Sequence, residues 1–249
     1  KASFFAEKTG ALHLAYTDLE MQVVEEYCEA MQGLKSAEVI PPEQVRSKSP
    51  AAVIRGLKGA LWTEEEVIVD PREAIFQTAN YLETLPGVKF VWGRAVNTID
   101  GNTAYSGQKH WSADRIFVCS GADFETLYPE LFQSISITKC KLQMMRLVKQ
   151  PENWRIGPPL CAGLSFIHYK GFQVAPSWEE LRKVYEEKYP DLIQWGIHVM
   201  VSQNGIGELT IGDSHEYGLE LSPFDRTEVN EMILDFLKSF AQFKDWRID

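Results

Sequence analysis

The chain has 249 residues, 45% of them hydrophobic, so it can bury a substantial core as one large domain or two small ones. Its formal charge of −10 argues against a nucleic-acid surface, which needs clustered Lys and Arg. No apolar run approaches the roughly 20 residues needed to cross a bilayer. We therefore predict a soluble, cytoplasmic protein with no membrane span and no nucleic-acid partner, and leave its oligomeric state open.

The four cysteines, Cys28, Cys119, Cys140 and Cys161, are far apart and form no Cys-x-x-Cys pair. This spacing encodes neither a zinc knuckle nor a redox dithiol, so we predict reduced thiols and no metal site. Cys119 lies in an apolar run without a local basic partner, and we interpret it as buried packing and not as a nucleophile.

The first half of the chain alternates strand and helix patterns. Residues 4–15 have β character, and a helical spacing follows from Asp18, which we expect to be the N-cap. Residues 41–60 are interpreted as a short helix and connector. Val67–Val69 then forms a strand, with Asp70 capping a helix that ends near residues 86–87.

Further extended structure is predicted for residues 88–122. Val88–Trp92 is expected to be a strand, and 94–99 a second extended run before a turn at 100–102. Residues 113–122 form a near-continuous apolar run closed by glycine. Such a run is typical of a buried parallel strand.

Strands dominate the second half. Residues 135–148 and 160–174 have strand patterns, Ser177 is expected to cap a helix over 178–188, and a hairpin is expected around Gln203-Asn204-Gly205. An amphipathic helix over 223–240 follows. The order of elements predicts an α/β layer joined to a mostly antiparallel, α+β part.

Six segments occur in an order that resembles a known family. They are Val67–Pro71, Val88–Phe90, Ala95-Val96, Asp114–Ala122, Lys139–Gln143 and Gly207–Ser214. This order is similar to that of FAD-dependent oxidoreductases of the D-amino-acid oxidase/glycine oxidase type. The resemblance implies a partial FAD-binding, glutathione-reductase-like layer joined to a mostly antiparallel substrate-binding sheet, with FAD as the cofactor.

The resemblance also implies a division of the chain into three parts. Residues 1–60 would supply a strand, helix and connector of the substrate domain, 61–135 a partial FAD-binding domain, and 136–249 the substrate-binding domain. The sequence has no Gly-x-Gly-x-x-Gly segment of the kind that seats a pyrophosphate on a helix N-terminus. We therefore expect the chain to lack both the N-terminal and the C-terminal flavin-binding segments of the family.

Cofactor-binding residues are implied only by this resemblance. The family's adenine border corresponds to Ala95 and Val96. The strand that passes the FAD diphosphate corresponds to Cys119, Ser120, Gly121 and Ala122.

Four residues are candidates for substrate binding. By resemblance to glycine oxidase, His198 lies near a substrate-site tyrosine position and His215 at a pocket position. His168 and Tyr169, on a segment expected to be extended, could reach the same cavity. Two imidazoles would favour an anionic ligand, because imidazolium donates hydrogen bonds to oxyanions. The alternative for each of the four is ordinary packing.

A narrower resemblance points to a bacterial subgroup associated with aminophosphonates. It is carried by Val69–Arg72, Cys119–Phe124, Lys141–Arg146 and Gly212–Tyr217. Asp213-Ser214-His215 is not a hydrolase triad, because adjacent strand residues point to alternate faces.

We therefore expect FAD-dependent oxidation of the C–N bond of a small anionic amine, an amino acid or an aminophosphonate, to an imine and then to a carbonyl and ammonia. No catalytic residue is assigned, because hydride transfer from a neutral amine is governed by positioning. The alternative is a non-catalytic binding or structural fragment of such a flavoprotein.

Overall fold

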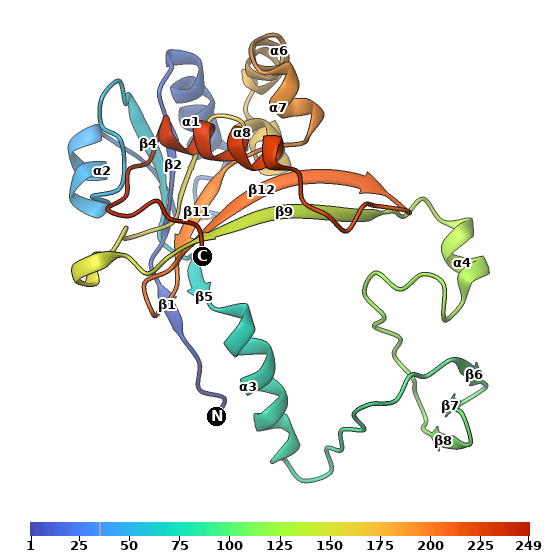
Figure 1. The fold of residues 1–249 in the computed structure, drawn as a ribbon. Helices are drawn as coiled ribbons and strands as arrows, with labels where there is room; N and C mark the ends of the chain where they lie inside the picture. Colours follow the sequence, from blue (N-terminus) through green and yellow to red (C-terminus); the bar gives the residue numbers. More distant parts are fainter. Residues whose placement is uncertain (35) are drawn as a thin grey trace.

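A seven-stranded mixed sheet forms the centre of the computed structural model, which describes residues 1–34 and 36–249 (Figure 1). Strand β10 runs parallel to β2, with Leu160 opposite Leu12, and the other neighbours pair antiparallel. From one edge to the other the strands are β3 (Ala37–Ile40), β4 (Gly59–Thr63), β2 (Ala11–Ala15), β10 (Leu160–Ala162), β11 (Met200–Gln203), β12 (Leu209–Gly218) and β9 (Lys139–Leu147).

One face of the sheet packs against α8 (Thr227–Lys238). Because successive strand residues point to opposite faces, Leu12 and Leu14 of β2 lie on this side. The helix contributes Val229, Ile233 and Leu237, a stripe spaced by four residues. The amphipathic helix predicted near the end of the chain is thus confirmed, with shorter bounds.

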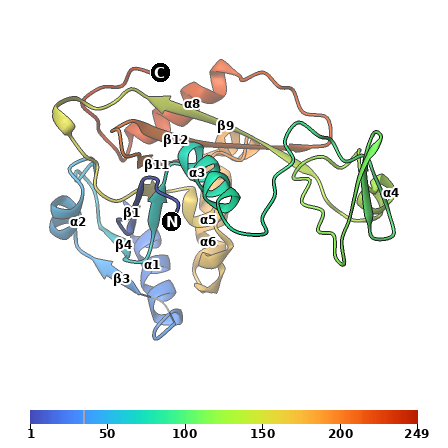
Figure 2. The same cartoon turned by 90° about the horizontal axis from the view of Figure 1, so that it is seen from below.

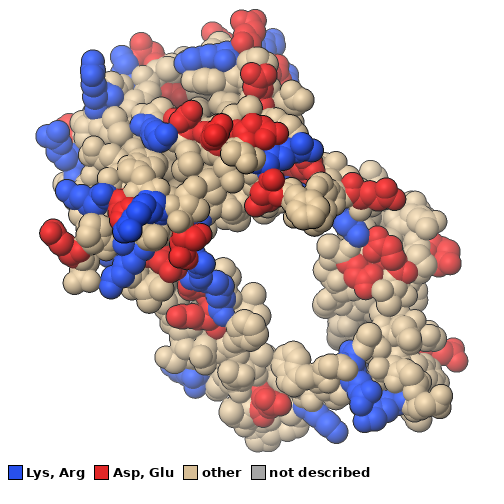
Figure 3. Space-filling view, viewed as in Figure 1, with Lys and Arg blue, Asp and Glu red and all other residues tan. Residues whose placement is uncertain are grey.

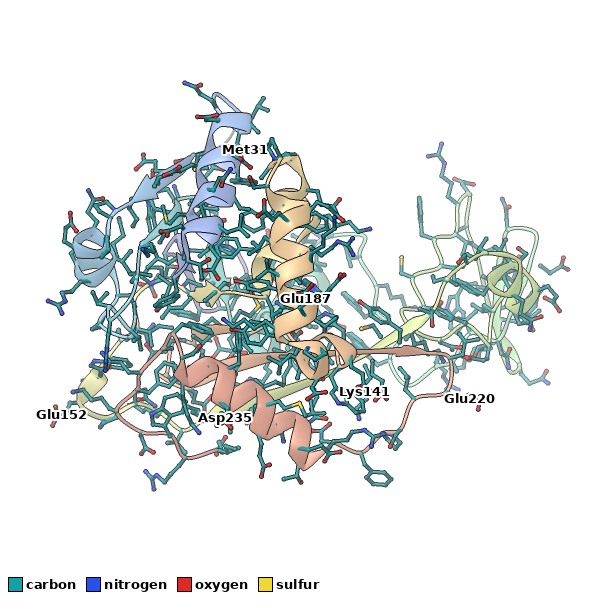
Figure 4. The ribbon with its side chains drawn as sticks, turned by 90° about the horizontal axis from the view of Figure 1, so that it is seen from above. Met31, Lys141, Glu152, Glu187, Glu220 and Asp235 are labelled. Atoms are coloured by element: carbon teal, nitrogen blue, oxygen red, sulfur yellow. The ribbon has the colours of Figure 1, made fainter. Side chains whose placement is uncertain are left out.

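The opposite face is covered by α1 (Asp18–Ala30), α5 (Ser165–His168), the 3-10 helix η2 (Lys170–Val174) and α6 (Trp178–Lys188). Viewed from above, α8 lies on one side of the sheet and α1 and α6 lie together on the other (Figure 4). The short helices α2 (Pro42–Lys48) and α7 (Pro190–Gln194) and the 3-10 turn η1 (Pro151–Asn153) complete this part.

Helix α1 begins with a capping box. The Thr17 side chain accepts from the Glu20 backbone N–H, while the Glu20 carboxylate accepts from the N–H groups of Tyr16 and Thr17. Glu20 is buried and also accepts from the Tyr185 hydroxyl of α6. The N-cap is therefore Thr17 and not the predicted Asp18, whose own side chain is exposed and pairs with Lys58.

A separate segment leaves the sheet through β5 (Val67–Val69), which pairs with β1 (Ala6–Lys8), and α3 (Pro71–Glu83). Asp70 caps α3 as predicted, accepting from the Arg72 N–H. Beyond α3 the chain forms an arm with the antiparallel strands β6 (Thr98–Asp100), β7 (Thr103–Ser106) and β8 (Lys109–Ser112), and then α4 (Pro129–Ser134), before β9 leads back (Figure 2).

The arm exposes much apolar surface. Phe117 is 82% exposed and Trp92 68% exposed, and Ile75 and Phe76 of α3 are exposed as well. The space-filling view has an open gap between the arm and the main body, edged largely by uncharged surface (Figure 3). The apolar sequence of this region therefore does not build a core among the described residues.

Several predicted strands are wrong in this region. Residues 88–92 and 113–122 are not strands, and of the run 94–99 only the end enters β6. Cys119, predicted to be buried, is exposed. A buried parallel strand needs hydrogen-bonded strands on both sides, and among the described residues no strand pairs with 113–122.

Two further expectations fail within the main body. Gly59 and Ala60, interpreted as the end of a connector, instead begin β4, which lies between β3 and β2. The strand predicted over 160–174 ends at Ala162, because the chain turns at Gly163, with φ of 55°, into α5. The helix at 178–188, the hairpin after residue 200 and the mixed α/β fold with an antiparallel-rich sheet are confirmed. The division at residues 60 and 135 stays a prediction.

Among the described residues, none of the helices is both long enough and apolar enough to span a bilayer.

Candidate functional site

A cavity of about 640 Å³ lies against the face of the sheet that α1 and η2 partly cover. The alternation that sends Leu12 and Leu14 toward α8 sends His13 of β2 into this cavity. Cys161 of β10 and Met200 of β11 join it from neighbouring strands. Its other walls come from β4, β5 and the aromatic side chains of α1 and the α5–η2 region, so most of the lining is apolar, as in small-molecule sites.

Two polar atoms at this cavity have no hydrogen-bond partner among the described residues. They are His13 Nδ1 and Thr63 Oγ1, both shielded from solvent. His13 lies among the rings of Phe166, Tyr169 and Phe172, at centroid distances of 6.1, 6.1 and 5.4 Å. Burial lowers the pKa of His13 to about 4, so its imidazole is neutral near pH 7. Unpartnered buried polar atoms are costly, and these two would be satisfied by a polar ligand.

Tyr169 connects this cavity to a group of three histidines. Tyr169 lines the cavity, its hydroxyl donates to Met200 Sδ at 3.7 Å, and its ring packs at 5.2 Å from the rings of both His168 and His198. Burial raises the pKa of the Tyr169 phenol, which therefore stays protonated.

The structure brings together His168, His198 and His215, which lie far apart in sequence. Ring centroids are 3.6 Å apart for His168 and His198, 4.6 Å for His168 and His215, and 5.1 Å for His198 and His215. His168 ends α5, His198 precedes β11 and His215 lies on β12, so three elements meet here. His168 and Tyr169 reach the cluster from a short helix and its C-cap, not from the predicted strand.

The charge state of this cluster differs from the sequence-based expectation. Burial, and next the neighbouring imidazoles, lower the pKa of His198 to about 3, and burial and His215 lower that of His168. Burial raises the pKa of Asp213, whose Oδ1 lies 3.2 Å from His198 Nε2. Although these atoms are close enough for an ion pair, both side chains are almost fully buried, so we assign a neutral His198. Burial thus disfavours the imidazolium form of His168 and His198, on which the expectation of an anionic ligand rested.

The six positions expected to contact FAD lie on the arm. Val96 and Ser120 are half-buried, while Ala95, Cys119, Gly121 and Ala122 are exposed, and none of the six lines the 640 Å³ cavity. These residues offer an open surface and backbone groups, not an enclosed dinucleotide pocket. The apolar cavity with its unpartnered atoms fits a small ligand or one edge of a ring system, so the described residues fit FAD only in part.

The sequence interpretation missed His13, Thr63, Cys161 and Met200, which line the cavity. For His13 there was a signal, since it is the polar residue in an otherwise apolar strand, Ala11-Leu12-His13-Leu14-Ala15. Thr63 was missed because no strand was predicted where β4 lies.

Comparisons with known proteins place this geometry in context. A family model described as "FAD dependent oxidoreductase" (DAO) matches residues 2–247. No curated protein sequence matches significantly. Among solved structures, glycine oxidases from Bacillus cereus and Geobacillus kaustophilus superpose with TM-scores of 0.67 and 0.67 at 11% and 14% identity. L-proline dehydrogenase from P. horikoshii superposes with a TM-score of 0.65 at 17% identity.

Each of these matches covers 98% of this chain but only 60% or 61% of the solved structure. At such identities the superpositions establish a shared fold, whereas the family model spans almost the whole sequence. The chain therefore belongs to the DAO family of FAD-dependent oxidoreductases.

Proposed function

We propose that this protein takes part in FAD-dependent oxidation of the C–N bond of a small amine, and that the cavity containing His13 binds the substrate. Family membership supports the cofactor and the reaction class. Solved structures of the same fold include glycine oxidases and an L-amino acid deaminase, which supports an amino-acid-like substrate.

The observation that carries the proposal is the cavity itself. Its volume of about 640 Å³ lies within the usual range for small-molecule sites, roughly 300–1,000 Å³. Its lining combines an apolar wall with two polar atoms to which the described part of the chain offers no partner, His13 Nδ1 and Thr63 Oγ1. A small molecule with one polar end and a short carbon skeleton satisfies both features.

FAD, when bound, supplies the two-electron acceptor for this chemistry. The residues of this chain would act by positioning. The neutral His13 imidazole can form a hydrogen bond with a neutral amine without competing for its proton, and Thr63 can donate or accept a second one. The apolar side chains around them exclude water, which strengthens both bonds.

We further propose that His168, Tyr169, His198 and His215 bind the anionic end of the substrate. The packing of Tyr169 against both the cavity and the histidines supports this direction for the ligand. An aminophosphonate is the proposed ligand because it carries an amine and an oxyanion at the two ends of a short chain.

The test is anaerobic reduction of protein-bound FAD, followed by its visible absorption. Aminophosphonates and simple α-amino acids are added separately to the full-length protein. We expect aminophosphonates to bleach the flavin. Bleaching by α-amino acids alone would overturn the phosphonate assignment, and a protein that takes up no FAD would favour a non-catalytic binding module.

A further inference from the structure

We propose that His168, His198 and His215 form a binding site for one divalent transition-metal ion of the Zn²⁺ or Co²⁺ type. One ligand nitrogen from each residue can be chosen so that all three lie within 4.8 Å of one another. Neutral imidazole nitrogen is a preferred ligand of these ions. The sequence spacing predicted no such site, because the three residues converge only through the fold.

The second nitrogens of two of these rings support the assignment. His215 Nδ1 lies 3.1 Å from the Gly196 carbonyl, to which it can donate, leaving Nε2 free to bind an ion. His198 Nε2 lies 3.2 Å from Asp213 Oδ1, and its Nδ1 is buried without a partner. Histidines that bind metals commonly hold their other nitrogen against a carbonyl or a carboxylate in this way.

Two buried polar atoms of the cluster lack a hydrogen-bond partner among the described residues, and a bound ion would provide for both. Besides His198 Nδ1, Asp213 Oδ1 is buried and makes no aligned hydrogen bond despite its closeness to His198 Nε2. A bound ion would satisfy His198 Nδ1 directly and would favour a proton on Nε2 that Asp213 accepts. One ion thus accounts for both atoms.

Binding requires a modest closure of the cluster. In a tetrahedral site with metal–nitrogen distances of about 2.1 Å, ligand nitrogens are about 3.4 Å apart, so the spread of up to 4.8 Å must shrink. The stacked pair of His168 and His198 must also open so that their ring planes converge on the ion. His198 is buried and held by its neighbours, whereas His168 and His215 are partly exposed, so we expect these two rings to rotate.

An ion held by three histidines keeps an open coordination position. If the proposed substrate is correct, this position would bind an oxygen of its anionic end. The ion itself would then supply the positive charge that attracts this oxygen. This second step rests on the proposed function, but metal binding itself does not.

The experiment titrates Co²⁺ into chelator-treated protein without FAD or amine and follows visible absorption. We expect a saturable d–d band at one ion per chain, lost on addition of Zn²⁺. His168→Ala and His215→Ala should each weaken Co²⁺ binding by at least about 10-fold, and Asp213→Asn by about 10–100-fold. His110→Ala, an exposed histidine of β8, is the matched control and should bind like the wild type.

A second measurement on the wild type does not depend on the folding of any variant. Zn²⁺ should protect His168 and His215 from diethylpyrocarbonate, read by mass spectrometry, and leave His110 reactive. A wild type without a saturable band, a band that survives the double substitution of His168 and His215, or equal modification with and without Zn²⁺ would each overturn the site. For the second step, methylphosphonate should shift the Co²⁺ band, and an unchanged band would overturn only that step.

Discussion

His198 and Asp213 are joined by two backbone hydrogen bonds across neighbouring segments of the sheet, and their side chains lie close together. Each backbone N–H donates to the other's carbonyl, at 3.2 and 2.9 Å, and His198 Nε2 lies 3.2 Å from Asp213 Oδ1. The two backbone hydrogen bonds fix the relative positions of the His198 and Asp213 backbones, and both side chains are buried next to each other. The position of the His198 ring is therefore set by the sheet and not by a flexible loop.

Asp213→Asn should stabilise the metal-free protein more at high pH than at low pH. Burial raises the pKa of Asp213, so the folded state binds its proton more tightly than the unfolded state. The contribution of this carboxyl to stability is greatest in acid and is lost as the pH rises through its folded pKa. An amide of the same shape avoids that loss.

Urea unfolding of both proteins at pH 4.5 and pH 8 measures this effect. Asp100→Asn, a change at an exposed position of β6, is the control. A difference between Asp213→Asn and the wild type that is larger at pH 4.5 would contradict the assigned direction.

His13→Phe should remove part of the acid sensitivity of the fold. The pKa of His13 falls from 6.5 to about 4 on folding, so below pH 6.5 the unfolded state binds a proton that the folded state refuses. This group's stability is complete above pH 6.5 and is lost as the pH falls toward 4. At pH 5 the loss amounts to about 2 kcal/mol, which a phenyl ring would not incur.

The measurement is the free energy of unfolding of the wild type and His13→Phe between pH 7.5 and 5. The two curves should diverge below pH 6.5, with the variant more stable. His110→Phe, at an exposed position, is the control. Parallel curves for His13→Phe and the wild type would show that His13 is not buried in its neutral form.

Several elements of the fold could be predicted from local patterns. The proline after Asp70, the alternation around the 203–205 turn and the four-residue spacing of Val229, Ile233 and Leu237 each correspond to an observed element. These signals act over a few residues, and the same local forces operate in the folded chain.

The arm could not be predicted in this way. Residues 113–122 have the composition of a buried parallel strand, but composition does not supply a neighbouring strand, and among the described residues no strand pairs with them. For the histidine cluster, the sequence identified the residues but not their proximity. His168, His198 and His215 were singled out by resemblance, yet their mutual distances depend on where α5 meets β11 and β12. Burial lowers the pKa of His168 and of His198, and the sequence pattern did not reveal that burial.

Asp70→Ala should destabilise the connection between α3 and the sheet. Asp70 is buried, caps α3 and accepts from Arg72 and from the Asn204 side chain of the β11–β12 turn. Its hydrogen bonds with Arg72 lower its pKa, so this contribution is present near pH 7 and is lost as the pH falls through the folded pKa. Loss of the cap alone costs about 1 kcal/mol.

Hydrogen exchange separates this local effect from global unfolding. Amides of the first turn of α3 and of residues 203–208 should exchange faster in Asp70→Ala, while those of α1 keep their protection. Asp114→Ala, at an exposed position of the arm, should leave all three regions unchanged. Equal acceleration in α1 would mean that Asp70 stabilises the whole fold and not this connection.

Thr63→Val should weaken substrate binding without lowering the free energy of unfolding. Thr63 lines the cavity, and its Oγ1 is shielded from water and has no hydrogen-bond partner among the described residues. The hydroxyl therefore does not stabilise the ligand-free protein. Valine has nearly the same shape and removes the unsatisfied group, which should leave the free energy of unfolding unchanged or raise it by up to about 1 kcal/mol. If the hydroxyl instead forms a hydrogen bond with the ligand, the same change should raise the KM of the proposed amine oxidation, or weaken binding of a substrate analogue, by about 10-fold. The reason is that a lost hydrogen bond in a water-free site costs about 1.4 kcal/mol. Thr103→Val, on β7 in the arm, controls for the removal of a hydroxyl away from the cavity. A Thr63→Val protein that is clearly less stable, with unaltered ligand binding, would assign Thr63 to the fold and remove it from the proposed site.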